Sequence, residues 1–209
     1  MRVPFNYLPY QFKSVKKYFI GWKKLIKSAQ FTLGPFVEEF EKSFAKFVGV
    51  KYCISTNNGT DALILSLKSL GVQKGDEVIV PPLTFSATAF SVLYLGAKPI
   101  FADVDKKTFN ISPDEILKKI NKKTKAIITV SIFGLIPDMI RIKKIARKNK
   151  IKIVEDNAET IFSSQKGKYS GTFGDLSILS FQRSKHLTVG DGGAINYCFP
   201  APTRPNVMR

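Results

Sequence analysis

The hydrophobic positions of the chain follow two alternating patterns. Apolar residues at helical spacing predict amphipathic helices over residues 37–47, 61–70, 87–95 and 138–149, and Ser112-Pro113 predicts the start of another. Short apolar runs between them predict buried strands at residues 52–55, 78–80, 99–102, 126–130, 151–154 and 176–180. The alternation predicts an α/β fold, a three-layer α/β/α sandwich around a mostly parallel sheet.

The same pattern predicts the domain organisation. A chain of 209 residues is long enough for one sizeable hydrophobic core. We expect a helical arm over residues 1–30 and one large domain over residues 31–195. After Ile195 the sequence becomes rich in proline and loses its periodicity, so residues 196–209 are expected to form an unstructured tail.

Composition narrows the class of protein. The sequence has no apolar run long enough to cross a bilayer, and its first residues lack the pattern of a secretory signal. Cys53 and Cys198 stand far apart without a metal-binding spacing, and Cys53 lies in an apolar run that predicts a buried thiol. We therefore expect a cytoplasmic protein without a metal site.

The formal net charge of +17 would suit nucleic acid, a membrane surface or an anionic substrate. The lysines, however, occur in short clusters along the whole chain and form neither an aromatic-interleaved patch nor an arginine-rich helix. We interpret most of them as solvated helix faces and expect no nucleic-acid partner.

Residues suited to binding a phosphate follow two of the predicted strands. In open parallel sheets, ligands bind beyond the carboxyl ends of the strands. Gly59 and Thr60 lie between a strand and a helix, where free amides and the helix dipole favour an anion. Ser180 closes another strand and has a hydroxyl that can donate to a phosphate. Either feature alone is equally compatible with an ordinary turn or strand end.

Three further residues suggest pyridoxal phosphate chemistry. Lys185 lies between Ser180 and a glycine-rich turn and is a candidate Schiff-base amine, although a single lysine is usually just exposed. Asp156 ends a strand and is suited to a protonated pyridine nitrogen, or to a simple turn cap. Phe85 could stack on a planar cofactor or pack in the core. Their shared position at strand ends favours the functional interpretation.

A series of motifs in a fixed order makes this interpretation specific. They are Thr32-Leu33-Gly34-Pro35, Asn57-Asn58-Gly59-Thr60-Asp61-Ala62-Leu63, Gly75-Asp76-Glu77-Val78-Ile79-Val80-Pro81, Thr84-Phe85-Ser86-Ala87-Thr88-Ala89, Gly96-Ala97-Lys98-Pro99-Ile100-Phe101-Ala102-Asp103-Val104-Asp105, Glu155-Asp156, Gly171-Thr172-Phe173-Gly174-Asp175 and the lysine loop after Ser180. Over residues 30–195 the chain resembles the DegT/DnrJ/EryC1/StrS sugar aminotransferases, which are fold type I enzymes dependent on pyridoxal phosphate.

The resemblance implies a role for each position. Lys185 would form the Schiff base with the cofactor and carry protons during the reaction. Asp156 would keep the pyridine nitrogen protonated, and Phe85 would stack on the ring. The cofactor phosphate would be bound by Gly59, Thr60 and Ser180. An amino group, usually from glutamate, would move to a keto group of a nucleotide-linked sugar, in the synthesis of cell-surface polysaccharide, lipopolysaccharide or sugar antibiotics.

The chain departs from the family in three ways. Glu159 occupies a position near the cofactor's phenolic oxygen that is often glutamine, and a carboxylate cannot donate a hydrogen bond unless protonated. Relatives that resemble perosamine-type aminotransferases also carry glutamate there. Asn157 replaces a small residue. Family members are homodimers nearly twice as long, so a C-terminal small domain is expected to be missing and the activity of this portion to be weak or absent.

Two alternatives remain open. Sugar dehydratases on the same fold carry histidine in place of the lysine; here Lys185 stands five residues after Ser180 and His186 is one residue late, which favours the aminotransferase. The chain could also be an inactive fragment, or a basic interaction protein that keeps an enzyme fold.

Overall fold

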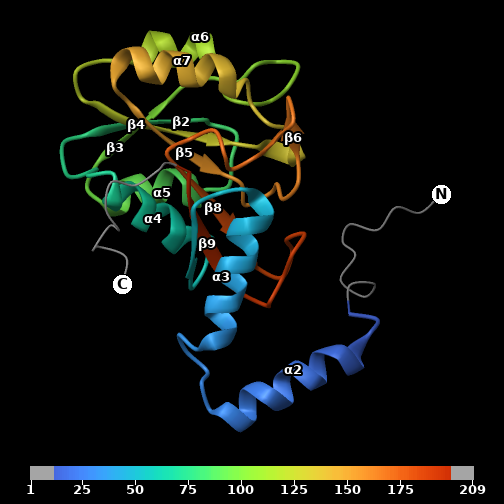
Figure 1. Ribbon diagram of the computed structural model, residues 1–209. Coiled ribbons are helices and arrows are strands. Elements are labelled where there is room, and N and C mark those ends of the chain that lie inside the picture. The colour runs from blue at the N-terminus through green and yellow to red at the C-terminus, as the bar shows by residue number, and fades with distance from the viewer. Residues whose placement is uncertain (1–11, 199–209) are drawn as a thin grey trace.

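A seven-stranded sheet forms the centre of the protein. The computed structural model describes residues 12–198 (Figure 1). In spatial order the strands are β1 (Tyr52–Thr56), β9 (Gly193–Tyr197), β8 (Leu176–Ser180), β5 (Lys152–Asp156), β4 (Thr124–Val130), β2 (Glu77–Val80) and β3 (Lys98–Phe101). β9 is antiparallel to both neighbours, and every other pair in this sheet is parallel. The predicted mostly parallel sheet is confirmed.

Three of the described α-helices begin at a residue whose side chain caps the helix. The described α-helices are α2 (Val15–Ser28), α3 (Pro35–Val48), α4 (Gly59–Ser69), α5 (Ala87–Tyr94), α6 (Pro113–Lys119) and α7 (Met139–Asn149), with a 3₁₀ turn at Ile132–Gly134 and a small hairpin of β6 (Ser164–Gln165) and β7 (Lys168–Tyr169). Side chains of Asn58, Ser112 and Asp138 accept hydrogen bonds from the first-turn amides of α4, α6 and α7. These bonds satisfy donors that would otherwise have no intrahelical partner.

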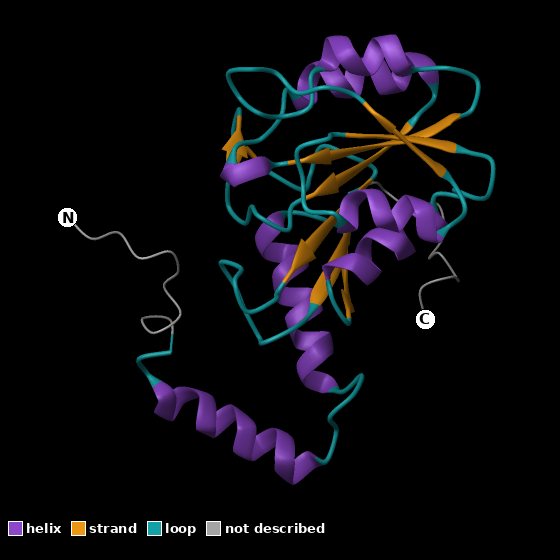
Figure 2. Cartoon of the chain, turned by 180° about the vertical axis from the view of Figure 1, so that it is seen from behind, coloured by secondary structure: helices purple, strands orange, loops and turns teal. Residues whose placement is uncertain are grey.

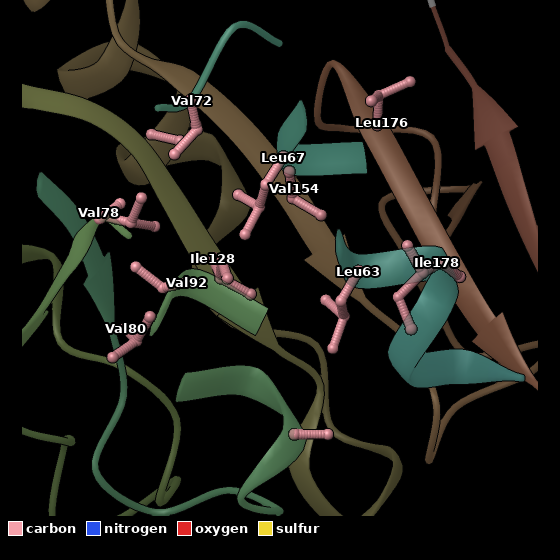
Figure 3. Packing of buried hydrophobic residues seen from close by; sticks show 14 of the residues in the cluster. Leu63, Leu67, Val72, Val78, Val80, Val92, Ile128, Val154, Leu176 and Ile178 are labelled. Carbon is pink, nitrogen blue, oxygen red and sulfur yellow. The ribbon is translucent and has the colours of Figure 1, made fainter. Parts of the chain in front are cut away.

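The helices lie on both faces of the sheet, as the sandwich prediction requires (Figures 1 and 2). Because side chains alternate along a strand, neighbouring residues serve different cores. Ile178 packs with Leu63 of α4 in one cluster (Figure 3), whereas Leu179 packs with Phe44 of α3 on the opposite face. Helices α6 and α7 cover the remainder of that opposite face. Full burial of a side chain such as Leu63 contributes about 1.5–3 kcal/mol.

Helix α2 stands away from this sandwich (Figures 1 and 2). It contains no buried residue, and Phe19 and Trp22 are 65% and 66% exposed. It forms the described part of the expected N-terminal arm; residues 1–11 of that arm lie outside the described residues. Between residues 12 and 198, no helix combines the length and apolar composition needed to span a membrane.

The C-terminal boundary lies later than the sequence pattern indicated. Asn196 and Tyr197, which were expected to begin an unstructured tail, belong to β9 and pair with both β1 and β8. Strand β9 has only five residues of mixed polarity, so periodicity cannot distinguish it from a loop. Pairing with a strand on each side determines its conformation. The rest of the expected tail, residues 199–209, lies outside the described residues.

Gly193 allows β9 to approach the turn that precedes α4. A Cβ atom on Gly193 would overlap the carbonyl group of Asn58 and lie 2.6 Å from Thr56 Oγ1. The overlap involves backbone atoms, so no side chain can rotate to relieve it. Only glycine permits this contact between the end of the lysine loop and the turn at residues 57–59.

We predict that Gly193→Ala lowers the free energy of unfolding by roughly 1–3 kcal/mol, because the added methyl group overpacks a backbone contact. Urea unfolding followed by circular dichroism measures the change. Gly21→Ala is the control: a Cβ at Gly21, on exposed α2, has no heavy atom within 4 Å, so its substitution should not destabilise. Equal stability of the two variants would contradict the proposed contact.

Candidate active site

A cavity of about 640 Å³ lies at the carboxyl ends of the parallel strands. All seven residues singled out in the sequence line it: Gly59, Thr60, Phe85, Asp156, Glu159, Ser180 and Lys185. They come from six different segments between residues 59 and 185, so folding brings together side chains far apart in the chain. The volume is in the range of pockets that enclose a small-molecule ligand.

Strand alternation selects the side chains that face this cavity. Ile178 pairs with Asp156 in neighbouring β5, and both point toward the layer of α4 and α5. Ser180, two residues after Ile178, points the same way. Glu155 points to the other side, where it accepts hydrogen bonds from three backbone amides at residues 171–174. Of the adjacent acids Glu155 and Asp156, only Asp156 lines the cavity.

The turn before α4 provides backbone amides for an anion. Gly59 and Thr60 are the first residues of α4, and their amides precede the first helical hydrogen bond, from Ala62 N to Asn58 O. A Cβ on Gly59 would lie 2.9 Å from the Cβ of Ser180, so glycine is needed for the turn to lie against β8. The Ser180 hydroxyl therefore lies beside the helix N-terminus, where the dipole favours negative charge.

Asp61 adds a carboxylate to the same turn. Its Oδ2 accepts hydrogen bonds from the side-chain amides of Asn57 and Asn58, both at 3.3 Å. These amides hold the carboxylate within the turn and offset its charge in part. Sequence reasoning did not single out Asp61, because its hydrogen bonds depend on the conformation of the turn.

Asp156 is a deeply buried carboxylate. Its Oδ2 accepts from Thr88 Oγ1 at 3.0 Å and its Oδ1 accepts from the backbone amide of Ala158 at 3.1 Å. Burial raises the pKa of Asp156, while the hydrogen bonds from Ala158 and Thr88 and the charge of Lys185 act in the opposite direction. A carboxylate poised in this way can hold a proton on a neighbouring ring nitrogen.

Lys185 lies at the cavity side of a well-defined loop. Its backbone amide donates to Gln182 O, and the Gln182 side chain in turn accepts from the amide and hydroxyl of Ser184. The Lys185 Nζ lies 3.9 Å from Glu159 Oε1, and the side chain is 22% exposed. Glu159 is held from its other oxygen by the backbone amide of Phe133 at 3.5 Å. The amine is thus inside the cavity and beside an acceptor.

The aromatic residue expected to contact a ligand lies at the cavity wall. Phe85 follows β2 and is 72% exposed, so it does not belong to a hydrophobic core. The sequence left open whether Phe85 packs in the core or contacts a ligand. Its exposure shows that it does not pack in the core. An exposed ring at a cavity wall offers a flat apolar face to a planar group.

The departure at Asn157 does not change the cavity. Asn157 is buried, and its Oδ1 accepts a hydrogen bond from Ser131 Oγ at 3.0 Å. It lines a small space on the far side of the sheet, near Phe44 and Leu179. The substitution therefore affects packing beneath the strands and leaves the ligand side unchanged.

Thr84 and Thr88 are also among the cavity residues that sequence reasoning did not single out. Thr84 precedes α5 and Thr88 lies in its first turn, so the available signal was two hydroxyl residues on either side of a predicted helix start. The structure places their hydroxyl oxygens 2.8 Å apart.

The cysteines take no part in the cavity. Cys53 is buried as expected, and burial raises the pKa of its thiol to about 12. Cys198 is partly buried and is also a free thiol. In the described part of the chain, no group of three or more His, Cys, Asp or Glu side chains is arranged to hold a metal ion.

The chain is similar in sequence to several curated proteins. The chain is 45% identical to the GDP-perosamine synthase of Caulobacter vibrioides over 78% of its own length and 44% of the relative's. It is 46% identical to the UDP-2-acetamido-2-deoxy-3-oxo-D-glucuronate aminotransferase of Pseudomonas aeruginosa, over 84% of this chain and 49% of that protein. The chain spans about half the length of the curated relatives it matches.

A solved structure with the same fold is described as a dehydratase. It is a GDP-4-keto-6-deoxymannose-3-dehydratase with bound GDP-perosamine, with a TM-score of 0.80 and 32% identity over 85% of this chain and 47% of the other. Other similar structures are described as holding PLP or PMP, the pyridoxal and pyridoxamine phosphates. The family model that matches residues 17–198 includes the strands, the cavity and the lysine loop, and the chain therefore belongs to the DegT/DnrJ/EryC1/StrS aminotransferase family.

Proposed function

We propose that this chain is the cofactor-binding portion of a pyridoxal-phosphate-dependent aminotransferase that acts on a nucleotide-linked sugar. The observation that carries the proposal is the convergence of a primary amine, Lys185, and a buried carboxylate, Asp156, in one cavity with an anion-binding helix N-terminus. Pyridoxal phosphate needs these three features: an amine for its aldehyde, an acceptor for its ring N–H and a phosphate site. When bound, the cofactor supplies an electron sink for moving an amino group.

The cavity fits the two ends of that cofactor. The glycine at position 59 leaves the space that a Cβ would fill beside Ser180, so a phosphate group can approach both the amides and the hydroxyl. Asp156 keeps one lone pair free on each oxygen, because each accepts a single hydrogen bond from the protein. Phe85 offers an exposed ring at the wall of the same cavity.

The chain's own side chains then have distinct tasks. Lys185 would hold the cofactor through its primary amine, and as a free amine its Nζ would carry protons within the cavity. Glu159 orients this amine, since the carboxylate lies 3.9 Å away and is itself fixed by the Phe133 amide. Asp156 would accept a hydrogen bond from the proton-bearing ring nitrogen of the cofactor and favour a positive charge there.

The substrate is proposed from the relatives. Both curated relatives described above are named for nucleotide-linked sugars, one with GDP and the other with UDP. We propose a keto group of such a sugar as the acceptor and glutamate as the amino donor. The net charge of +17 is compatible with an anionic nucleotide.

The position of His186 argues against the dehydratase alternative. His186 is exposed and does not line the cavity, whereas Lys185 does. A dehydratase that replaces the lysine with histidine would need the imidazole where the amine lies. The cavity geometry therefore supports amino transfer.

We also propose a cytoplasmic homodimer. Free Cys53 and Cys198 are compatible with a reducing compartment. The exposed apolar side chains of α2, including Phe19 and Trp22, could be covered by a second chain.

The proposal predicts a single covalent labelling site. Incubating the chain with pyridoxal phosphate and reducing with borohydride should label Lys185, located by peptide mass spectrometry. Lys185→Arg keeps the positive charge but removes the primary amine, so labelling should fall to background. Lys168→Arg, at an exposed lysine of β7, is the matched control and should label normally. Labelling mainly at another lysine, or none on a folded chain, would overturn the assignment.

A second prediction follows from the burial of Asp156. Its pKa is raised on folding, so the folded chain binds this proton more tightly and loses stability as pH rises through the interval above the ordinary value of 3.8. Asp156→Asn should therefore raise the free energy of unfolding at about pH 7 by ~0.5–2 kcal/mol, and the gain should shrink toward about pH 4.

Urea unfolding at both pH values measures this effect, and borohydride labelling of the same variant should decrease. Glu159→Gln is the comparison, because Glu159 is only partly buried and its loss should change stability much less. A variant Asp156→Asn that is less stable at neutral pH would mean that Asp156 is an anchor of the fold.

A further inference from the structure

We infer that Thr88 is a positioning residue of this site, whose hydroxyl orients the Asp156 carboxylate and keeps it ionised, with Thr84 setting the direction of the hydrogen bond. The inference rests on the proposed function in that it assigns Asp156 to the cofactor ring. Thr88 is the second residue of α5 and is fully buried. It contributes to the site through Asp156, 68 residues away in the chain.

The direction of the hydrogen bonds follows from the chemistry of the groups. An ionised carboxylate can only accept, so Thr88 Oγ1 donates its single proton to Asp156 Oδ2 at 3.0 Å. The contact between Thr84 Oγ1 and Thr88 Oγ1, at 2.8 Å, must then have Thr84 as the donor. The chain of bonds runs from Thr84 to Thr88 to Asp156, and each donor polarises the next.

The hydroxyls of Thr84 and Thr88 offset part of the free-energy cost of burying the Asp156 charge. Burial disfavours the ionised form of Asp156, and the structure provides few groups that compensate. The charged side chains that act on it are Lys185, which favours the carboxylate, and Glu159, which opposes it. The Ala158 amide fixes Oδ1 only. Thr88 thus supplies the neutral donor that fixes the orientation of Oδ2.

The main experiment needs no cofactor. In the full chain labelled with ¹³C at aspartate carboxyl groups, NMR would follow the titration of Asp156, whose signal is identified by its loss in Asp156→Asn. Thr88→Val keeps the shape but removes the hydroxyl, so the Asp156 titration should move to higher pH. Thr88→Ser restores a donor and should return the midpoint toward that of the unchanged chain.

Ser91→Ala is the matched control. Ser91 lies on the same helix, is equally buried, and donates to the backbone carbonyl of Thr88 without touching Asp156. Loss of the Ser91 hydroxyl should leave the midpoint of the Asp156 titration unchanged. An unshifted midpoint in Thr88→Val, or an equal shift in Ser91→Ala, would overturn the inference. If circular dichroism shows that Thr88→Val does not fold, Thr84→Val tests the inference instead. Losing the Thr84 hydroxyl, which donates to Thr88, should shift the midpoint of the Asp156 titration in the same direction but by less.

Pyridoxal phosphate affinity, measured by quenching of intrinsic fluorescence, provides the second readout. Thr88→Val should weaken it roughly tenfold, because a hydrogen bond to a charged group is lost, and Thr88→Ser should recover most of the loss. Unchanged affinity in Thr88→Val would contradict a role toward the cofactor. If no variant binds the cofactor while the Asp156 titration still responds to Thr88, the proposed function fails and the Thr88–Asp156 coupling remains.

Discussion

The site depends on a carboxylate that is withdrawn from water at the end of a strand. A buried charge is costly unless it is hydrogen-bonded or paired, so Asp156 restricts the elements around it. Helix α5 must present Thr88 to one oxygen, the chain after β5 must turn so that Ala158 presents its amide to the other, and the lysine loop must bring a cation close. Three separate segments therefore converge on one group.

Much of the fold could be predicted from the sequence, because the spacing of apolar residues along the chain indicates which side chains are buried. Helix starts at Ser112 and Asp138 agree with the structure, and so do the apolar strands β2, β4, β5 and β8. Strand β9 was not predicted as a strand, because its short, mixed sequence is held in place by neighbours on both sides. The hairpin of β6 and β7 has two residues in each strand, which is too few to form a pattern.

The candidate site could be predicted through the residues that end strands. Lys185, Asp156 and Ser180 each follow a recognisable apolar run, and the structure brings them into one cavity. Thr88 could not be recognised in the same way, since its importance comes from a contact with Asp156 across 68 residues. A hydroxyl near the start of a helix is common, and only the tertiary structure distinguishes this one from a surface threonine.

The position of β9 has a consequence for the order in which the protein can be made. Among the described strands, β1 pairs with β9 alone, and residues 57–192 separate the two. A ribosome releases β1 well before β9, so until β9 emerges β1 and one side of β8 stay open as unpaired edges. The turn at residues 57–59, which follows β1, lies against Gly193 of β9 and beside Ser180 of β8. The strand that closes this sheet therefore also contacts the turn of the binding site, so both are completed by the same segment of the chain.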